Sequence, residues 1–200
     1  GDDKPIVLTL QTGETDIAQD DVIGKINFQA PDEGTGTDAI LVAAGIEAIS
    51  EGDFSSSSNA TKLSFKTGAS EAATEKMSIS SAGNVTMKNT ATTDDSPMVL
   101  TLQTGETDIA ANDVLGKIDF QAPDEGTGTD AILVAAGIEA VSEGDFSSSS
   151  NATKLSFKTG ASEAASEKMS LSSGGNLTIS GDLTISGDDL TMGTNTSGNL

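Results

Sequence analysis

The first group of residues whose types and spacing could do chemistry is GTGTDA, at residues 34–39. It has the G-x-G-x-x-A form of a dinucleotide-binding loop, with Glu51 and Asp53 near the usual acidic position. However, Pro31 interrupts the tight connection that this loop needs after its strand, and Asp38 would place a negative charge where the pyrophosphate belongs. We interpret the segment as a glycine-rich loop and predict no cofactor.

The second group consists of carboxylates in two acidic loops, TGETDIAQDD and PDEGTGTD. Carboxylate and carbonyl oxygens are the ligands of hard cations such as calcium. The candidate ligands are Asp16, Asp20, Asp21, Asp32, Glu33 and Asp38. Their spacing fits neither the twelve-residue calcium loop nor a glycine-rich nonapeptide. The sequence therefore predicts a solvated acidic surface and no metal site, with a cation-binding module kept as an alternative.

The third group pairs serine with lysine, as Ser64, Lys66 and Ser78 do, and could supply an activated nucleophile. Paired carboxylates could in principle hydrolyse a glycan, but the chain has no Trp or Tyr to form a sugar platform. We interpret these side chains as the wet face of a strand and predict no catalytic residue. Five Asn residues lie in N-x-Ser/Thr sequons, from which we infer no modification: Asn59, Asn84, Asn151, Asn176 and Asn195.

The composition excludes several classes of function. The chain has no His, Cys or Arg, and its formal net charge is -21. Without His and Cys it lacks the usual neutral-pH base, thiol nucleophile and zinc-thiolate ligands. Without Arg it lacks the bidentate phosphate fork, and its negative charge repels nucleic acid and anionic membranes. No apolar run approaches the length of about 20 residues that spans a bilayer, so we predict neither nucleic acid nor membrane as a partner.

The apolar core that this chain can build is thin. Leu, Ile, Val and Phe together number 42 residues, or 21% of the chain. That share is close to the roughly 20% below which a highly charged chain is expected to be disordered. Association of several chains would remedy the deficit by sharing one core. We therefore expect an obligate oligomer.

An internal repeat organises the chain. Residues 2–88 align with residues 94–180 at an offset of 92 without gaps and with 13 differences, most of them conservative. So long a period indicates a small domain per copy. We predict one β-rich module at residues 1–92, a second at residues 93–184, and the start of a short-repeat shaft or linker at residues 185–200.

The tail has a shorter repeat, LTISGD at residues 177–182 and again at residues 183–188, followed by LTMG. Leu and Ile alternate with Thr and Ser, which predicts short strands ended by Gly-Asp turns. Such strands suit a narrow shaft completed by neighbouring chains. The first residues, GDDKPIVLTL, have no basic start or cleavage pattern, so we expect an excerpt from a longer chain and not a signal peptide.

Period-two alternation predicts the strands within each copy. In the first copy these are PIVLTLQTG, DVIGKINFQA ended by Pro31, TKLSFKTG, and EKMSI followed by a turn at residues 82–84 and a further strand from Val85. The apolar stretch at residues 38–52 is ambiguous. Gly45 and the β-branched residues favour a strand, whereas the Ala content and Asp38 as an N-cap keep a helix as the alternative.

The order of these segments resembles the β-rich repeats of tail fibres and other appendages of marine bacteriophages. The segments that carry the resemblance are LGKIDF, then ILVAAGIEAVSEGDF, then NATKLSFKTGASEAASEKMSLSSGGNLTI, with residues 169–177 matching the last element well. The resemblance covers nearly the whole chain and implies homotrimeric, all-β fibres on a virion. It brings no functional residues, because it rests on patterning and not on a catalytic signature.

The sequence therefore predicts an all-β, elongated and homotrimeric fibre segment without enzymatic activity, located on a virion or otherwise extracellular. Its partners would be sister chains and other fibre or virion proteins, and a host receptor would be contacted by regions outside this segment. The alternatives are the shaft of a cellular filament or adhesin, and a cation- or glycan-binding module.

Overall fold

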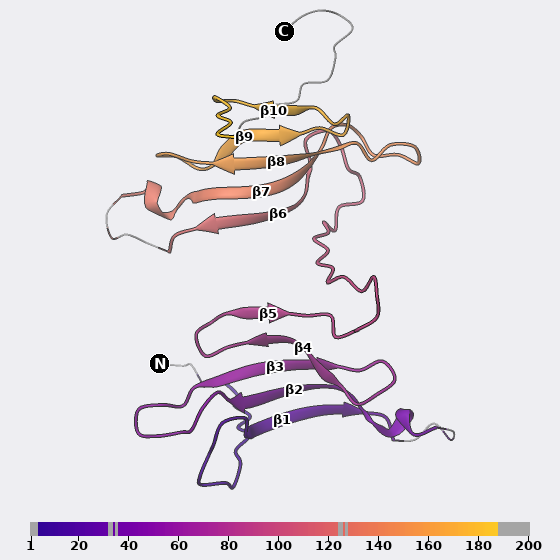
Figure 1. The fold of residues 1–200 in the computed structure, drawn as a ribbon, viewed down its shortest axis with the longest axis vertical. Coiled ribbons are helices and arrows are strands. Elements are labelled where there is room, and N and C mark those ends of the chain that lie inside the picture. The colour runs from indigo at the N-terminus through magenta and orange to yellow at the C-terminus, as the bar shows by residue number, and fades with distance from the viewer. Residues whose placement is uncertain (1–3, 32–33, 35, 124–125, 127, 188–200) are drawn as a thin grey trace, which may run out of the picture. The chain divides into compact units, whose positions relative to one another are not determined.

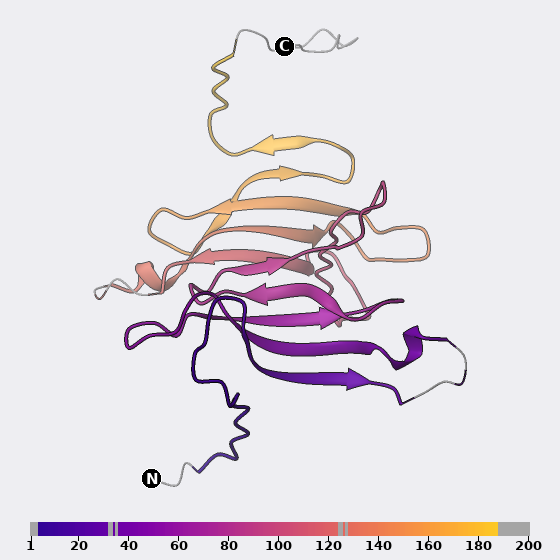
Figure 2. The ribbon, with the colours of Figure 1, turned by 60° about the horizontal axis from the view of Figure 1, so that its bottom comes forward.

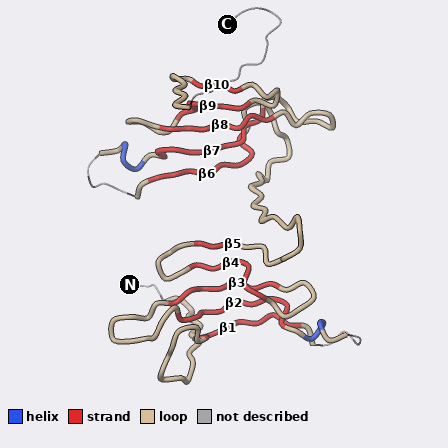
Figure 3. Tube along the Cα trace, in the orientation of Figure 1, coloured by secondary structure: helices blue, strands red, loops and turns tan. Residues whose placement is uncertain are grey.

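The computed structural model describes residues 4–31, 34, 36–123, 126 and 128–187. The chain divides into two compact units, Gly1–Val99 and Leu100–Leu200. Each unit contains one five-stranded antiparallel sheet, in which neighbouring strands follow one another along the chain (Figure 1). The prediction of an all-β fold is confirmed, because only two three-residue 3-10 helices accompany the strands in the described part of the chain (Figure 3).

In the first unit the sheet order is β1-β2-β3-β4-β5. The strands are β1 (Val22–Gln29), β2 (Val42–Ser50), β3 (Thr61–Thr67), β4 (Thr74–Ile79) and β5 (Val85–Met87), with the 3-10 helix η1 (Asp38–Ile40) before β2. The second unit repeats this order with β6 (Val114–Gln121), η2 (Asp130–Ile132), β7 (Val134–Ser142), β8 (Thr153–Thr159), β9 (Ser166–Leu171) and β10 (Leu177–Ile179). Figure 2 shows the same two meanders from a second direction.

The ambiguous stretch at residues 38–52 is a strand over most of its length. Only η1 is helical, and β2 follows it as the longest strand of the sheet. The helix alternative is therefore wrong beyond one short turn. Ile46 pairs with Ile26 on one side and with Phe65 on the other, so the β-branched residues occupy the middle of the sheet, where they pack well.

Three predicted strand regions are not strands in the structure. Residues 5–13, their repeat at residues 97–105, and residues 183–187 have the expected alternation but no regular secondary structure. A strand is maintained by hydrogen bonds to a neighbouring strand, and none of these segments joins either sheet. The predicted strand around Leu190 lies outside the described residues.

The turn between β4 and β5 was predicted correctly. Gly83 has φ +81, which a glycine adopts without steric cost. Ser80 N donates to Asn84 O at 3.0 Å, and Gly83 N donates to Ser80 O at 2.9 Å. The turn brings β5 against β4, where Met87 pairs with Met77 and Val85 with Ile79.

Candidate functional site: an open apolar sheet face

One face of the first sheet carries two rows of apolar side chains, which we call the apolar face. The cross-strand register places them in a row of Ile26, Ile46, Phe65, Met77 and Met87 and a row of Ala48, Leu63, Ile79 and Val85. The second sheet repeats it with Ile118, Ile138, Phe157, Met169 and Ile179, and with Ala140, Leu155, Leu171 and Leu177. Such a face is normally covered by another layer.

The apolar face is open within a single chain. Leu63 is 39% exposed, Met87 43% and Val85 55%, and Leu177 of the second sheet is 59% exposed. Among the described residues only three apolar side chains are buried, namely Ala73, Val141 and Ala165. Neither sheet therefore has a hydrophobic centre of its own, and the thin core expected from the composition is the one observed.

One end of the apolar face is closed by the chain itself. Ser50 follows Ile46 and Ala48 at alternate positions of β2 and is 1% exposed. Its hydroxyl accepts a hydrogen bond from Asp21 N at 2.9 Å and donates one to Ala18 O. The loop before β1 is thereby fastened over the end of β2, and Ser142 makes the same contacts with Asp113 and Ala110.

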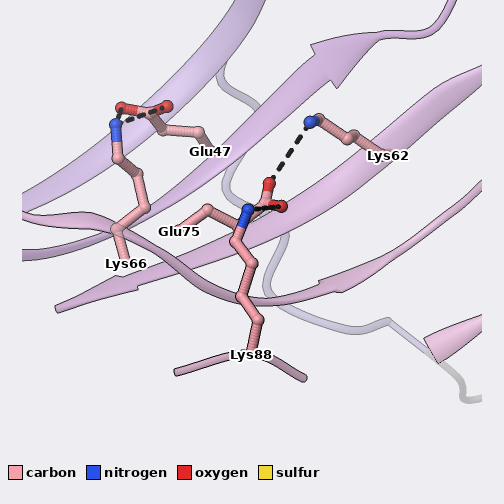
Figure 4. Close-up of polar contacts among 5 residues, drawn as sticks. All are labelled: Glu47, Lys62, Lys66, Glu75 and Lys88. Carbon is pink, nitrogen blue, oxygen red and sulfur yellow. Dashed lines mark hydrogen bonds and ion pairs between the residues drawn. The ribbon is translucent and has the colours of Figure 1, made fainter. Parts of the chain in front are cut away.

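The opposite face, which we call the polar face, is covered by its own side chains. Lys66 Nζ lies 3.0 Å from Glu47 Oε1, and Glu75 contacts Lys62 at 3.2 Å and Lys88 at 3.4 Å. Figure 4 shows these two clusters side by side over the sheet. Beneath them Ser64 is 1% exposed, so the long side chains close this face without a second layer.

Electrostatics on the polar face favour the ionised carboxylate. Partial burial acts to raise the pKa of Glu75, but the nearby Ser64 hydroxyl and the ammonium groups of Lys62 and Lys88 outweigh it and lower the pKa below its ordinary value of 4.5. In the second sheet a hydrogen bond from Lys154 lowers the pKa of Glu167. The polar face is thus arranged for ion pairing at neutral pH.

The predicted chemical groups are not assembled into a reactive centre. The candidate Ser-Lys pair does not form a hydrogen bond in the structure, because the Ser64 hydroxyl is buried beneath the ion pairs and Lys66 is bound to Glu47. The glycine-rich segment at residues 34–39 leads into a 3-10 helix of three residues, and the described residues that follow form no longer helix whose N-terminus could hold a pyrophosphate. Glu51 accepts a hydrogen bond from Ser81 N and Asp53 accepts one from Gln19 N, so both carboxylates fasten loops.

The candidate calcium ligands do not converge in the described part of the chain, where no group of three carboxylates is placed to hold a metal ion. Asp21 accepts a hydrogen bond from Ala18 N at 2.7 Å, and Asp20 lies in a turn with φ +70. Asp32 and Glu33 lie outside the described residues, as does the sequon residue Asn195. The other four sequon residues are exposed between strands: Asn59, Asn84, Asn151 and Asn176.

The buried serines Ser50 and Ser64 escaped prediction from sequence. Serine is common throughout the chain, and a strand serine that faces water has the same pattern as one that is covered. The sequence hints at the burial of Ser50 in one way. Ser50 continues the alternation of Ile46 and Ala48, so its side chain points to the apolar side of β2, and the second copy repeats this spacing. Among the described residues, no helix has the length and apolar character that crossing a bilayer requires.

Comparison with known proteins gives weak structural similarities. No protein-family model matches the sequence, and no curated protein matches it. Among solved structures, the chain is similar to the carboxy-terminal domain of the bacteriophage T5 L-shaped tail fibre, with 10% identity, a TM-score of 0.41, and coverage of 100% of this chain and 96% of that one.

A second similar structure is the same T5 domain together with its intramolecular chaperone domain. It has 10% identity and a TM-score of 0.37, and the match covers 96% of this chain and 65% of that one. At this level the two similarities establish neither a family nor a function for this chain.

Proposed function

We propose that this chain is a structural segment of an extracellular fibre, most specifically of a phage tail fibre, in which sister chains cover the apolar face of each sheet. The observation that carries this proposal is the open apolar face. In the described part of the chain each sheet leaves this face partly exposed, with Ile26 at 41% in the first sheet and Ile118 at 46% in the second. A homotrimer closes three such faces around one axis, with the polar faces outside.

The exposed area of the chain supports self-association. A folded monomer of 20.1 kDa is expected to expose about 8,700 Å², and two separate domains of half that mass about 10,500 Å². The chain as a whole exposes 15,181 Å², which is more than two compact domains would, as expected of sheets whose apolar faces are covered on assembly.

The repeat and the charge support a fibre in preference to a closed globular oligomer. Two sheets of the same strand order follow each other along one chain, so additional copies would extend the assembly without changing its cross-section. The net charge of -21 keeps such a surface soluble and away from nucleic acid and anionic membranes. The function is then mechanical: the segment spans distance and carries a host-attachment tip formed elsewhere, and it requires no catalytic residue, cofactor or metal.

The assignment to a phage, in preference to a cellular filament or adhesin, is supported by the resemblance of the repeat to marine phage appendages. The T5 tail-fibre domains belong to the same class, but their similarity is too weak to support the assignment. Location of the gene among capsid and tail genes would agree with a virion appendage, whereas an upstream secretion signal would identify a cellular filament.

Electron microscopy of a chain with one extra 92-residue copy tests the mechanical proposal. We expect rods whose length grows by a constant increment for the added copy while their width stays constant. Particles that grow in every dimension would contradict a fibre. The unmodified chain is the matched control, because it shares every sequence element with the lengthened one.

A further inference from the structure

Two segments with apolar alternation pair with no strand in the described part of the chain. These are residues 5–11 and their repeat at residues 97–103, which we call the straps. In the first strap Ile6 is 102% exposed and Leu8 78% exposed. Within the described part of the chain, the backbone N–H and C=O groups of residues 5–11 make no hydrogen bond. Figure 2 shows this indigo trace leading away from the five strands and not alongside one.

Each strap is anchored at one point to its own apolar face. Leu10 lies over β1 so closely that a Cβ added to Gly24 would be 2.9 Å from Leu10 Cβ, and the repeated pair Leu102 and Gly116 gives 2.8 Å. Leu10 also lines a shallow hollow with Ile26, Ile46 and Leu63. The glycine therefore permits the strap to cross the sheet at its first strand.

The edges of the sheet are poor partners for a strap. At β1 the register shifts between Val22 and Gly24 and again between Phe28 and Gln29, and such bulges oppose the addition of a strand. At the other edge, β5 has only three residues. The apolar side of the strap therefore needs a sheet face, and its own face is reached by Leu10 alone.

The strap has the length to reach a second face. In an extended strap Ile6, Leu8 and Leu10 point to the same side, and about 13 Å separate Ile6 from Leu10 at roughly 3.3 Å per residue. Packed sheets lie about 10 Å apart. A strap that begins on its own sheet at Leu10 can thus end on the sheet of a neighbouring chain.

We propose that each strap is exchanged between chains: Leu10 stays on its own apolar face, while Ile6 and Leu8 cover the apolar face of a second copy around Leu63. Closed rotational symmetry brings equal modules of sister chains together, so the first strap meets the first sheet and the second strap meets the second sheet. This inference rests on the proposed self-association and adds which segment crosses between chains. The exchange would tie the chains of the fibre to one another at every module.

Inter-chain disulfide formation between two singly substituted chains tests this exchange. The chain has no cysteine, so Leu8→Cys in one population and Leu63→Cys in another, made distinguishable by a mass tag, introduce one thiol each. The two are refolded together and oxidised. We expect a tagged-to-untagged disulfide between position 8 and position 63, which can only join different chains.

The matched control is Thr9→Cys mixed with Leu63→Cys, because Thr9 points to the other side of an extended strap. We expect at least a fivefold lower yield of the mixed disulfide from Thr9→Cys. Equal yields from the two positions, or disulfides only between two Leu8→Cys chains, would overturn the exchange. If the mixed disulfide is absent while the solution mass remains that of an oligomer, the exchange fails and the proposed self-association stands.

Discussion

The two faces of each sheet differ in how they are covered from water. On the polar face, Glu47 and Lys66 lie over β2 and β3 and Ser64 beneath them is buried, so long charged side chains serve as the cover. On the apolar face Leu63 is 39% exposed, and among the described residues the cover comes from Leu10 over β1 and from the loop fastened to Ser50 at the end of β2. One face is complete within a chain and the other is not.

This difference teaches which part of the molecule is built for assembly. Apolar area exposed to water costs about 25 cal/mol per Å², so an open face of this size favours association strongly. Exposed ion pairs contribute about 0–1 kcal/mol each and have no need of a partner chain. Substitutions at neighbouring positions of one strand that point to opposite faces should therefore differ greatly in effect.

The largest effect is expected from Ile46→Asp combined with Ile138→Asp. A charge in the middle of both apolar faces cannot be covered without a large desolvation cost, so we expect the oligomer to be lost. Glu47→Gln with Glu139→Gln is the matched pair on the polar face, and we expect it to keep the oligomer and to cost about 1–2 kcal/mol per copy, because the Glu47 side chain is only 11% exposed. Light scattering and denaturant unfolding measure both. Equal effects on the two faces would remove the distinction between them.

The next effect is expected from Gly24→Ala with Gly116→Ala. The added methyl groups would lie 2.9 Å and 2.8 Å from the Cβ atoms of Leu10 and Leu102, and overpacking of this kind costs about 1–3 kcal/mol. Gly52→Ala is the control, because nothing lies within 4 Å of its added Cβ, and we expect a change within about 0.5 kcal/mol. The denaturant midpoints of the Gly24→Ala, Gly116→Ala variant and of Gly52→Ala measure this difference in stability. An unchanged midpoint for Gly24→Ala would mean that Leu10 does not rest on β1.

A comparable or slightly smaller effect is expected from Ser50→Ala. Its hydroxyl binds both Asp21 N and Ala18 O in a buried site, and loss of the hydroxyl leaves these groups only the long 3.4 Å hydrogen bond between them, at a cost of about 1–3 kcal/mol. Hydrogen exchange at Asp21 N should become faster, and unfolding should require less denaturant. Ser56→Ala, at an exposed turn position, should change neither quantity.

The smallest effect is expected from Glu75→Gln, which we estimate at about 0.5–1 kcal/mol at pH 7. The pKa of Glu75 is lowered in the folded chain, so its stabilising effect is present above the ordinary value of 4.5 and is lost as pH falls below it. The difference in unfolding free energy between the wild type and Glu75→Gln should therefore shrink between pH 7 and pH 3. Taking the difference between the wild type and Glu75→Gln cancels the pH-dependent effect that the other charged groups have on the unfolding free energy of both proteins.

Glu167→Gln sharpens this prediction within the repeat. Glu75 forms ion pairs with both Lys62 and Lys88, whereas the one ion pair of Glu167 within the described residues is with Lys154, because residue 180 of the second copy is Ser in place of Lys. We expect Glu167→Gln to cost less than Glu75→Gln. A larger cost for Glu167→Gln would show that the contact with Lys88 does not stabilise the first copy.

The strands that pair within the chain were predictable from sequence because alternation and turn residues act locally. β3 and the turn at Gly83 are examples, and the all-β class follows from them. The same alternation at residues 5–13 and 183–187 gave wrong predictions of strands in the single chain. Alternation shows which side of a segment is apolar, but it does not show which chain supplies the partner.

The bulges of β1 and the burial of Ser50 could not be predicted from the alternation of apolar and polar residues. The bulges in β1 depend on how Gly24 and Gln29 meet β2, which no periodicity encodes. The burial of Ser50 depends on a loop that is remote from it by 29 residues in sequence. The prediction that residues 34–39 and Ser64 form no functional site rests on composition, which lacks the side chains that would complete such sites, and it stays a prediction. The proposed module boundaries, at residues 92 and 184, remain predictions from the repeat.

The most direct test of the central claim is the solution mass of the full chain by light scattering, recorded with circular dichroism on the same sample. The apolar faces of folded chains must be covered, so we predict that the β-sheet signal appears together with a mass of three times 20.1 kDa. A chain of 20.1 kDa that shows the full β-sheet signal and unfolds cooperatively would contradict the claim that sister chains complete its sheets.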